Sequence, residues 1–242
     1  MSEDKVFVAS PEAKGQAKQL RLFAILAWVI AIAGEVFAIL KLISNETLVW
    51  LIVTIVVILG LSILGSVLWK KANRLDPASE KDKTRFFIQN QLGAIMAAIA
   101  FLPLVILILT NKDIDGKTKG IAGSVAVVAL LAASILGIDF DPASVEKYTK
   151  EINEQTETIK SLNNGVDLVY WTNQGNKFHL YSDCQHIRNR DQHNGTVAQA
   201  WEERKIGDSE LCKTCEKRAI KGNDGSLLED ENVDTPEGAA IE

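Results

Sequence analysis

The chain has 242 residues, of which 47% are hydrophobic and 24% are charged, and its formal net charge is -5. A charge this mildly acidic excludes the strongly basic class of proteins that coat nucleic acids. Nearly all long apolar runs lie before residue 140, whereas all three cysteines lie after residue 180, so composition divides the chain into two parts.

Four apolar segments in the first part are long enough to cross a membrane. They cover residues 20–43, 48–69, 86–110 and 120–139. At 1.5 Å of rise per residue, about 20 apolar residues cross a hydrocarbon core of ~30 Å. The run from Leu48 to Leu59 also lacks the polar stripe that a buried soluble helix would normally show. The sequence therefore predicts an α-helical membrane protein with a four-helix transmembrane domain over residues 20–139.

The first apolar segment is predicted to stay in the protein as an anchor. It is too long for a cleaved signal peptide, and no small-residue cleavage site follows it before Lys41.

Basic residues set the expected orientation, because connections that remain in the cytoplasm are rich in lysine and arginine. The N-terminal segment, residues 1–19, carries Lys14 and Lys18, whereas the connection at residues 44–47 carries no basic residue. Six basic residues lie between the second and third apolar segments: Lys70, Lys71, Arg74, Lys81, Lys83 and Arg85. We therefore predict that both termini are cytoplasmic.

One four-residue sequence occurs twice, as Asp76-Pro77-Ala78-Ser79 after the second apolar segment and as Asp141-Pro142-Ala143-Ser144 after the fourth. An aspartate cap followed by proline is a favourable helix start, so each copy predicts a juxtamembrane helix. One interpretation is a duplicated two-span hairpin, and the other is that two helices share a good start signal. Four identical residues do not decide between them.

Glu35 lies inside the first apolar segment. An ionisable group at this depth is costly and is by default a candidate functional residue. One hypothesis places Glu35 on an ion or proton pathway. The alternatives are that it lies near the outer interface or pairs with a polar group of another helix.

Residues 141–164 are predicted to form a helical stalk that ends at Gly165. Its apolar residues follow a spacing of three and four, interrupted by Gln155: Val145, Tyr148, Ile152, Ile159 and Leu162. Such a stripe fits a short coiled coil that joins copies of the chain, or packing against the helix expected after Asp76. The sequence leaves both interpretations open.

Residues 166–218 are predicted to form a small soluble α+β domain. Residues 167–172 and 177–181 have strand composition and are separated by a turn at 173–176. Thr196 and Gln199 have the spacing of a capping box, which predicts a helix through residue 204 that stops near Gly207. Residues 219–242 are acidic and glycine-rich, which predicts a disordered tail.

Three cysteines and one histidine of this domain have the spacing of a metal site. His179 and Cys184 are separated by four residues, and Cys212 and Cys215 form a C-x-x-C pair. An odd cysteine count is a poor disulfide framework, whereas C-x-x-C presents two thiolates to one ion. The four residues would complete a tetrahedral Cys₃His site, which is typical of structural zinc, so Zn²⁺ is the expected cofactor. A core of about fifty residues is small enough to need such a site.

The domain contains two further histidines, His186 and His193. His186 is the rival fourth ligand, although its C-x-H spacing from Cys184 is cramped for one ion. His193 is predicted to lie in a loop.

The same stretch resembles a known family. The residues that carry the resemblance are Val169-Tyr170-Trp171-Thr172, Gly175, Phe178-His179, Cys184, Gly195-Thr196-Val197-Ala198-Gln199-Ala200 and the pair Cys212 and Cys215. They look like the Ada-type metal-binding domain, and more closely like its small variant appended to bacterial nucleases and membrane proteins. The resemblance covers about fifty of the 242 residues. It implies a bacterial protein in which His179, Cys184, Cys212 and Cys215 bind zinc.

Two positions depart from that family. Leu211 stands where proline is usual, and His179 stands where the DNA-repair member has its methyl-accepting cysteine. Because methyl transfer in that member needs a metal-bound thiolate, we do not expect this activity here.

No nucleophile–base pair, phosphate-binding loop or pair of carboxylates stands out, so the sequence predicts a protein that is not an enzyme. The leading hypothesis is a multi-pass protein of the bacterial inner membrane that displays a structural zinc module to a cytoplasmic protein partner. Such an adaptor, sensor or assembly protein could form a homo-oligomer through its spans or stalk. The alternatives are a small transporter or channel component that uses Glu35, and a membrane-tethered nucleic-acid binder. Eight basic and eight acidic residues within 166–218 disfavour nucleic-acid binding.

Overall fold

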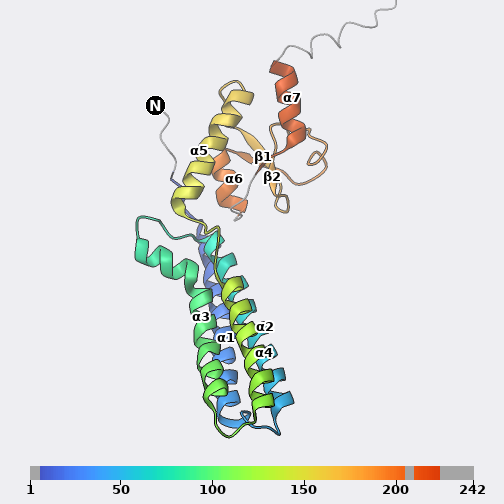
Figure 1. Cartoon of the computed structure of the whole chain (residues 1–242). Coiled ribbons are helices and arrows are strands. Elements are labelled where there is room, and N and C mark those ends of the chain that lie inside the picture. The colour runs from blue at the N-terminus through green and yellow to red at the C-terminus, as the bar shows by residue number, and fades with distance from the viewer. Residues whose placement is uncertain (1–5, 205–209, 224–242) are drawn as a thin grey trace, which may run out of the picture. The chain divides into compact units, whose positions relative to one another are not determined.

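The computed structural model describes residues 6–204 and 210–223 (Figure 1). Over this part of the chain it has seven helices and four short strands, which divide into two compact units. The four-helix unit is Val8–Tyr148, and the C-terminal unit begins at Thr149 and includes Phe7. The prediction of a mostly helical chain with four long apolar helices and a small C-terminal sheet region is confirmed.

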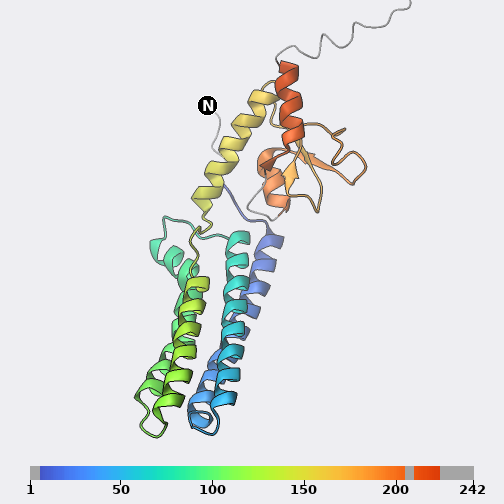
Figure 2. The same cartoon turned by 45° about the vertical axis from the view of Figure 1, so that its right-hand side comes forward.

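Each predicted apolar segment is a helix that is long and apolar enough to cross a membrane. These helices are α1 (Pro11–Lys41), α2 (Leu48–Leu75), α3 (Lys83–Thr110) and α4 (Gly116–Gly137). They form two antiparallel hairpins, α1 with α2 and α3 with α4, which lie side by side (Figure 2). Helix α1 begins well before residue 20, because the Ser10 hydroxyl accepts the N–H of Ala13 at 3.2 Å and caps it.

The four-helix unit buries many small side chains and exposes many large apolar ones, although Leu51, Phe101 and Leu104 are also buried. Alanines make up most of the buried face of α1: Ala13, Ala17, Ala24, Ala27, Ala31 and Ala38. The same helix exposes several large side chains, among them Leu22, Phe23, Val29, Ile30 and Phe37. Helices α3 and α4 cross where two glycines meet, and a Cβ atom added to Gly137 would lie 2.6 Å from the backbone nitrogen of Ala94. So many exposed large apolar side chains are unusual for a water-soluble protein.

The predicted helix starts at Asp76 and Asp141 are wrong, whereas the helix predicted after the second copy is present. Asp76 instead ends α2 and pairs with Arg21 at 2.9 Å. Helix α3 begins several residues later, where Asp82 caps it. Helix α5 (Val145–Leu162) begins after the second copy, and its first turn is capped by the Ser144 hydroxyl.

The two copies pair with each other, which explains why they stay outside the helices. A parallel backbone bridge joins Ala78 to Ser144. The Ser79 hydroxyl donates to the Glu146 carboxylate, and the Ser144 hydroxyl donates to the Glu80 carboxylate, both at 2.5 Å. We call these two bonds the serine–glutamate clasp. Each serine bonds to the glutamate that follows the other copy, and this reciprocity favours the duplicated-hairpin interpretation.

Helix α5 covers most of the predicted stalk, and from Thr149 onward it belongs to the C-terminal unit. Ile152 and Ile159 on its apolar stripe are buried. Gln155, which interrupts that stripe, accepts the indole N–H of Trp201 at 2.8 Å. The apolar stripe of α5 is therefore covered within the C-terminal unit. Gln155, the polar residue in this stripe, hydrogen-bonds to Trp201 of the same unit.

The predicted hairpin of the C-terminal unit is confirmed, and it is shorter than expected. Strands β1 (Val169–Trp171) and β2 (Lys177–Phe178) are joined by a bridge between Tyr170 and His179, with two backbone hydrogen bonds of 2.7 Å. Two strands were not predicted: β3 (His193–Gly195) pairs antiparallel with β1, and β4 (Glu210–Leu211) pairs parallel with β2.

Two short helices complete this unit. Helix α6 (Val197–Arg204) has the predicted capping box, because the Thr196 hydroxyl accepts the N–H of Gln199 and the Gln199 side chain accepts the N–H of Thr196. Helix α7 (Lys213–Asn223) continues past the domain boundary predicted at residue 218. The predicted stop near Gly207 and the rest of the predicted tail, residues 224–242, lie outside the described residues.

Candidate metal centre

The candidate ligands are brought together by the ends of β2 and β4. These strands are parallel, and Phe178 lies opposite Leu211. The next residue on each strand is a candidate ligand, so His179 and Cys212 leave the sheet as neighbours, with the Cys212 N–H bonded to the Phe178 carbonyl at 2.9 Å. Cys215 lies in the first turn of α7, and Cys184 lies in the turn that follows β2.

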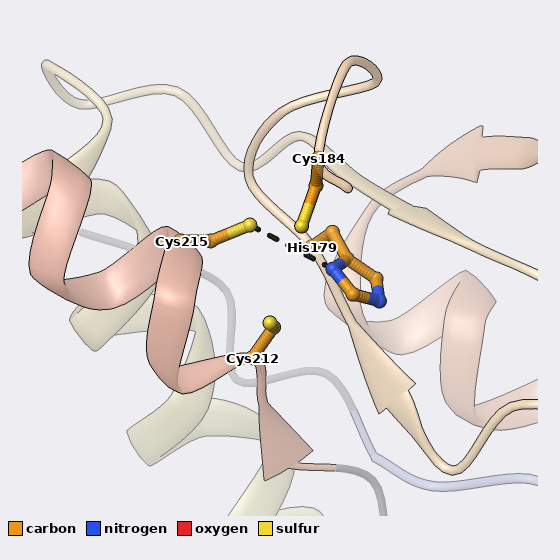
Figure 3. A group of neighbouring side chains, drawn as sticks. All are labelled: His179, Cys184, Cys212 and Cys215. Carbon is orange, nitrogen blue, oxygen red and sulfur yellow. Dashed lines mark hydrogen bonds between the residues drawn. The ribbon is translucent and has the colours of Figure 1, made fainter. Parts of the chain in front are cut away.

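The four side chains converge on one point, as Figure 3 shows. The ligand atoms of His179, Cys184, Cys212 and Cys215 all lie within 4.8 Å of one another, and all four residues are buried. The Cys215 Sγ lies 3.7 Å from the His179 Nδ1. Two sulfur ligands of one tetrahedral zinc ion would be ~3.8 Å apart, given Zn–S bonds of about 2.3 Å. The group can therefore hold one metal ion.

The two thiols of the C-x-x-C pair have different electrostatic environments. Burial raises the pKa of Cys215 to about 12. Burial also opposes ionisation of Cys212, but its sulfur accepts the N–H groups of Cys215 and Thr214, and the pKa of Cys212 falls below its ordinary value. A thiolate at Cys215 therefore needs a positive charge beside it, which a bound metal ion supplies.

The other two histidines lie outside this group. The ring of His186 is 6.3 Å from that of His179, and its Nε2 lies 3.3 Å from the Thr214 hydroxyl oxygen. His193 was predicted to lie in a loop, but it belongs to β3, where it is paired and stacked with Trp171. The spacing argument that favoured His179 over His186 thus agrees with the geometry.

An arginine missed by the sequence analysis holds the turn that carries Cys184. The Arg218 guanidinium on α7 donates to both carboxylate oxygens of Asp183 at 2.9 Å. It also lies over the Tyr181 ring, 4.3 Å from the ring centroid. The bonds to Asp183 raise the pKa of Arg218, so the guanidinium stays charged. Arginine and aspartate lie 35 residues apart, and no local pattern links them.

Glu35 lies far from this group in the sequence and has a partner of its own. Its side chain is buried, and the carboxylate accepts the backbone N–H of Leu104 at 3.2 Å. Leu104 follows Pro103, whose ring has no N–H and disturbs the hydrogen bonds of the surrounding turn. Of the alternatives, Glu35 therefore pairs with a polar group of another helix, here a backbone amide beside the proline.

Comparison of the chain with protein-family models, curated proteins and solved structures found no match.

Proposed function

We propose that the protein is an integral membrane protein that displays a zinc-stabilised module to the cytoplasm. The module is the C-terminal unit, and it serves a cytoplasmic protein partner as a non-enzymatic adaptor, sensor or assembly factor. The observation that carries this proposal is a buried group of three cysteines and one histidine, with ligand atoms within 4.8 Å, in a chain with four membrane-length helices.

Membrane insertion is supported by the distribution of side chains in the four-helix unit. Large apolar side chains on all four helices are about half exposed or more, among them Phe23, Trp50, Ile106 and Leu131. Such a surface would aggregate in water, whereas lipid tails cover it without cost. Small residues inside the unit allow the close helix contacts on which association within a bilayer depends.

Zinc is supported by the chemistry of the ligands. Thiolate and imidazole together select zinc over calcium or magnesium, which prefer oxygen ligands. Four buried protein ligands leave no open position for water or substrate, which is typical of a structural rather than a catalytic ion. The resemblance to the Ada-type metal-binding domain points to the same four residues, and a cytoplasmic location would keep the thiols reduced.

The test is the zinc content of the full chain, purified in a neutral detergent and measured by elemental analysis. We expect one zinc ion per chain. The variant His179→Gln should lose most of it, because a closed four-ligand site would be left with three ligands. The matched variant His186→Gln removes a histidine that lies outside the group and should keep its zinc.

Equal zinc loss in the two variants would contradict the assignment of His179 as a ligand. A wild-type chain without bound metal would overturn the zinc module. Extraction of the chain from membranes by alkaline carbonate, without detergent, would overturn the proposed insertion.

A further inference from the structure

A cavity of about 400 Å³ adjoins the candidate metal centre. Two of the four candidate ligands, His179 and Cys212, also line this cavity. Its size falls within the range of small-ligand sites in proteins. Its other walls come from the turn after β1, the loop after Cys184 and the start of α7, so segments distant in sequence build it.

The charged side chains that line the cavity are all basic. They are Lys177, Arg190 and Lys213. Glu210, which is outside the lining, pairs with Lys177 at 2.9 Å. Over the described residues, Arg190 and Lys213 form no ion pair. A zinc ion bound to three thiolates carries one net negative charge, and Glu210 adds a second. The three cations outnumber these two negative charges by one, so the surroundings of the cavity stay positive.

Hydrogen-bond donors accompany these cations. Thr172, Asn176 and Thr214 line the same cavity and carry hydroxyl or amide donors. Lys213 and Thr214 are the first two residues of α7, an eleven-residue helix, so the cavity lies at its N-terminus. The partial positive charge at a helix N-terminus favours anions. The Cys212 sulfur already accepts the N–H groups of Thr214 and Cys215 at this helix end, so the cavity itself offers side-chain cations and polar donors.

We propose that this cavity binds a phosphate group. A tetrahedral oxyanion can accept hydrogen bonds from several directions at once, and an arginine such as Arg190 matches two of its oxygens. Phenylalanine, tyrosine and tryptophan are absent from the residues that line the cavity, and the rings among them are the imidazoles of His179 and His186. The phosphate belongs to a free phosphate compound or to the headgroup of an anionic lipid. This inference goes beyond the proposed function, in which the zinc ion has a structural role.

The test is calorimetric titration of the zinc-loaded full chain in neutral detergent with inorganic phosphate at constant ionic strength. We expect saturable binding that Arg190→Gln weakens by about tenfold, because a charge-assisted hydrogen bond is lost. The matched variant Arg188→Gln removes an exposed arginine of the same loop that does not line the cavity, so it should bind phosphate like the wild type. Zinc content, measured in each sample, shows that the neighbouring centre is intact.

A second arm identifies the source of the phosphate. The chain is placed in nanodiscs of phosphatidylcholine alone or with phosphatidic acid, and the titration is repeated. Weaker phosphate binding in the anionic nanodiscs alone would assign the site to a lipid headgroup, and equal binding would assign it to a free phosphate compound.

Absence of saturable binding to the zinc-loaded chain, or equal weakening by Arg190→Gln and Arg188→Gln, would overturn the inference. A chain without zinc would instead contradict the proposed function, so the two failures are distinguishable.

Discussion

The two units of this protein are held together in different ways. In the four-helix unit, helices of 22 to 31 residues bury small and large apolar side chains along their length. In the C-terminal unit, the strands have two or three residues. The ends of β2, β4 and α7 come together at His179, Cys212 and Cys215. The first unit distributes its stabilising contacts over many positions, whereas a metal ion held by the candidate ligands would concentrate much of the stabilisation of the second at four side chains. Point changes should therefore act differently in the two units.

The largest difference is expected on removal of the metal. Chelation of zinc, or the variant Cys215→Ala, should unfold most of residues 166–223 and leave the four-helix unit folded. Binding of structural zinc contributes about 10 kcal/mol or more to the folding of small domains, a value that depends on pH. Hydrogen exchange with mass spectrometry measures the two units separately. The control is Lys217→Ala, a change at an exposed residue of α7.

Loss of amide protection in the C-terminal unit alone would confirm the difference between the units. Loss in both units together would show that their folding is coupled.

In the four-helix unit, the largest effect should come from a backbone contact. The variant Gly137→Ala places a methyl group 2.6 Å from the backbone nitrogen of Ala94, so α3 and α4 must separate. We expect a loss of about 1–3 kcal/mol in the free energy of unfolding, as for other overpacked sites. Gly60→Ala is the matched control, because no atom lies within 4 Å of the added Cβ. That variant should be neutral or gain up to about 1 kcal/mol from helix propensity.

Thermal unfolding in detergent, followed by circular dichroism, compares the two glycine variants. Equal unfolding temperatures would show that the contact between α3 and α4 is easily relieved.

The pairing of Glu35 predicts an effect of similar size within the same unit. The variant Glu35→Leu leaves the buried N–H of Leu104 without its acceptor, which should cost about 1–3 kcal/mol. In Glu35→Gln, an amide oxygen remains to accept this bond, so the loss should be smaller. Denaturation in detergent measures the difference, and equal losses would contradict a hydrogen-bonding role. Ion or proton flux in proteoliposomes that is abolished by Glu35→Gln would instead favour the transport hypothesis.

The features that could be predicted from the sequence are those encoded by local patterns. The four long helices follow from apolar length alone, and the start of α6 follows from the spacing of Thr196 and Gln199. The metal group could be predicted because cysteine and histidine have few other reasons to occur at such spacings. In each case the relevant information lies within a short stretch or in the residue types themselves.

The features that could not be predicted depend on partners distant in the chain. Strand β4 has two residues, too few for a pattern, and it exists because it pairs with β2. The repeated Asp-Pro-Ala-Ser sequences have a helix-start signal, but each copy bonds to the other instead. The cavity beside the candidate metal centre is basic, and its three cations, Lys177, Arg190 and Lys213, come from separate segments of the chain. No local sequence pattern therefore indicates that they lie together. An equal count of acidic and basic residues over the domain conceals this local excess.

The smallest predicted effect concerns the serine–glutamate clasp and its dependence on pH. Partial burial opposes ionisation of Glu146, but hydrogen bonds from the Ser79 hydroxyl and the Glu80 N–H outweigh it and lower the pKa of Glu146. Because the folded pKa lies below the unfolded value of about 4.3, the stabilisation is complete above that pH. It is lost as the pH falls through the folded pKa. The effect should be below about 1 kcal/mol, because water screens a nearly exposed carboxylate.

The variant Glu146→Gln tests this directly, because glutamine resembles the protonated acid at every pH. Its unfolding temperature should lie below that of the wild type at pH 6, and the difference should shrink towards pH 3 as the wild-type carboxylate becomes protonated. Glu154→Gln, which changes an exposed glutamate of α5 paired with Lys150 at 3.7 Å, is the control and should show no such convergence. A constant difference for Glu146→Gln would mean that the clasp does not depend on the charge of Glu146. The pairing of the two repeats would then rest on the backbone bridge between Ala78 and Ser144, which does not titrate.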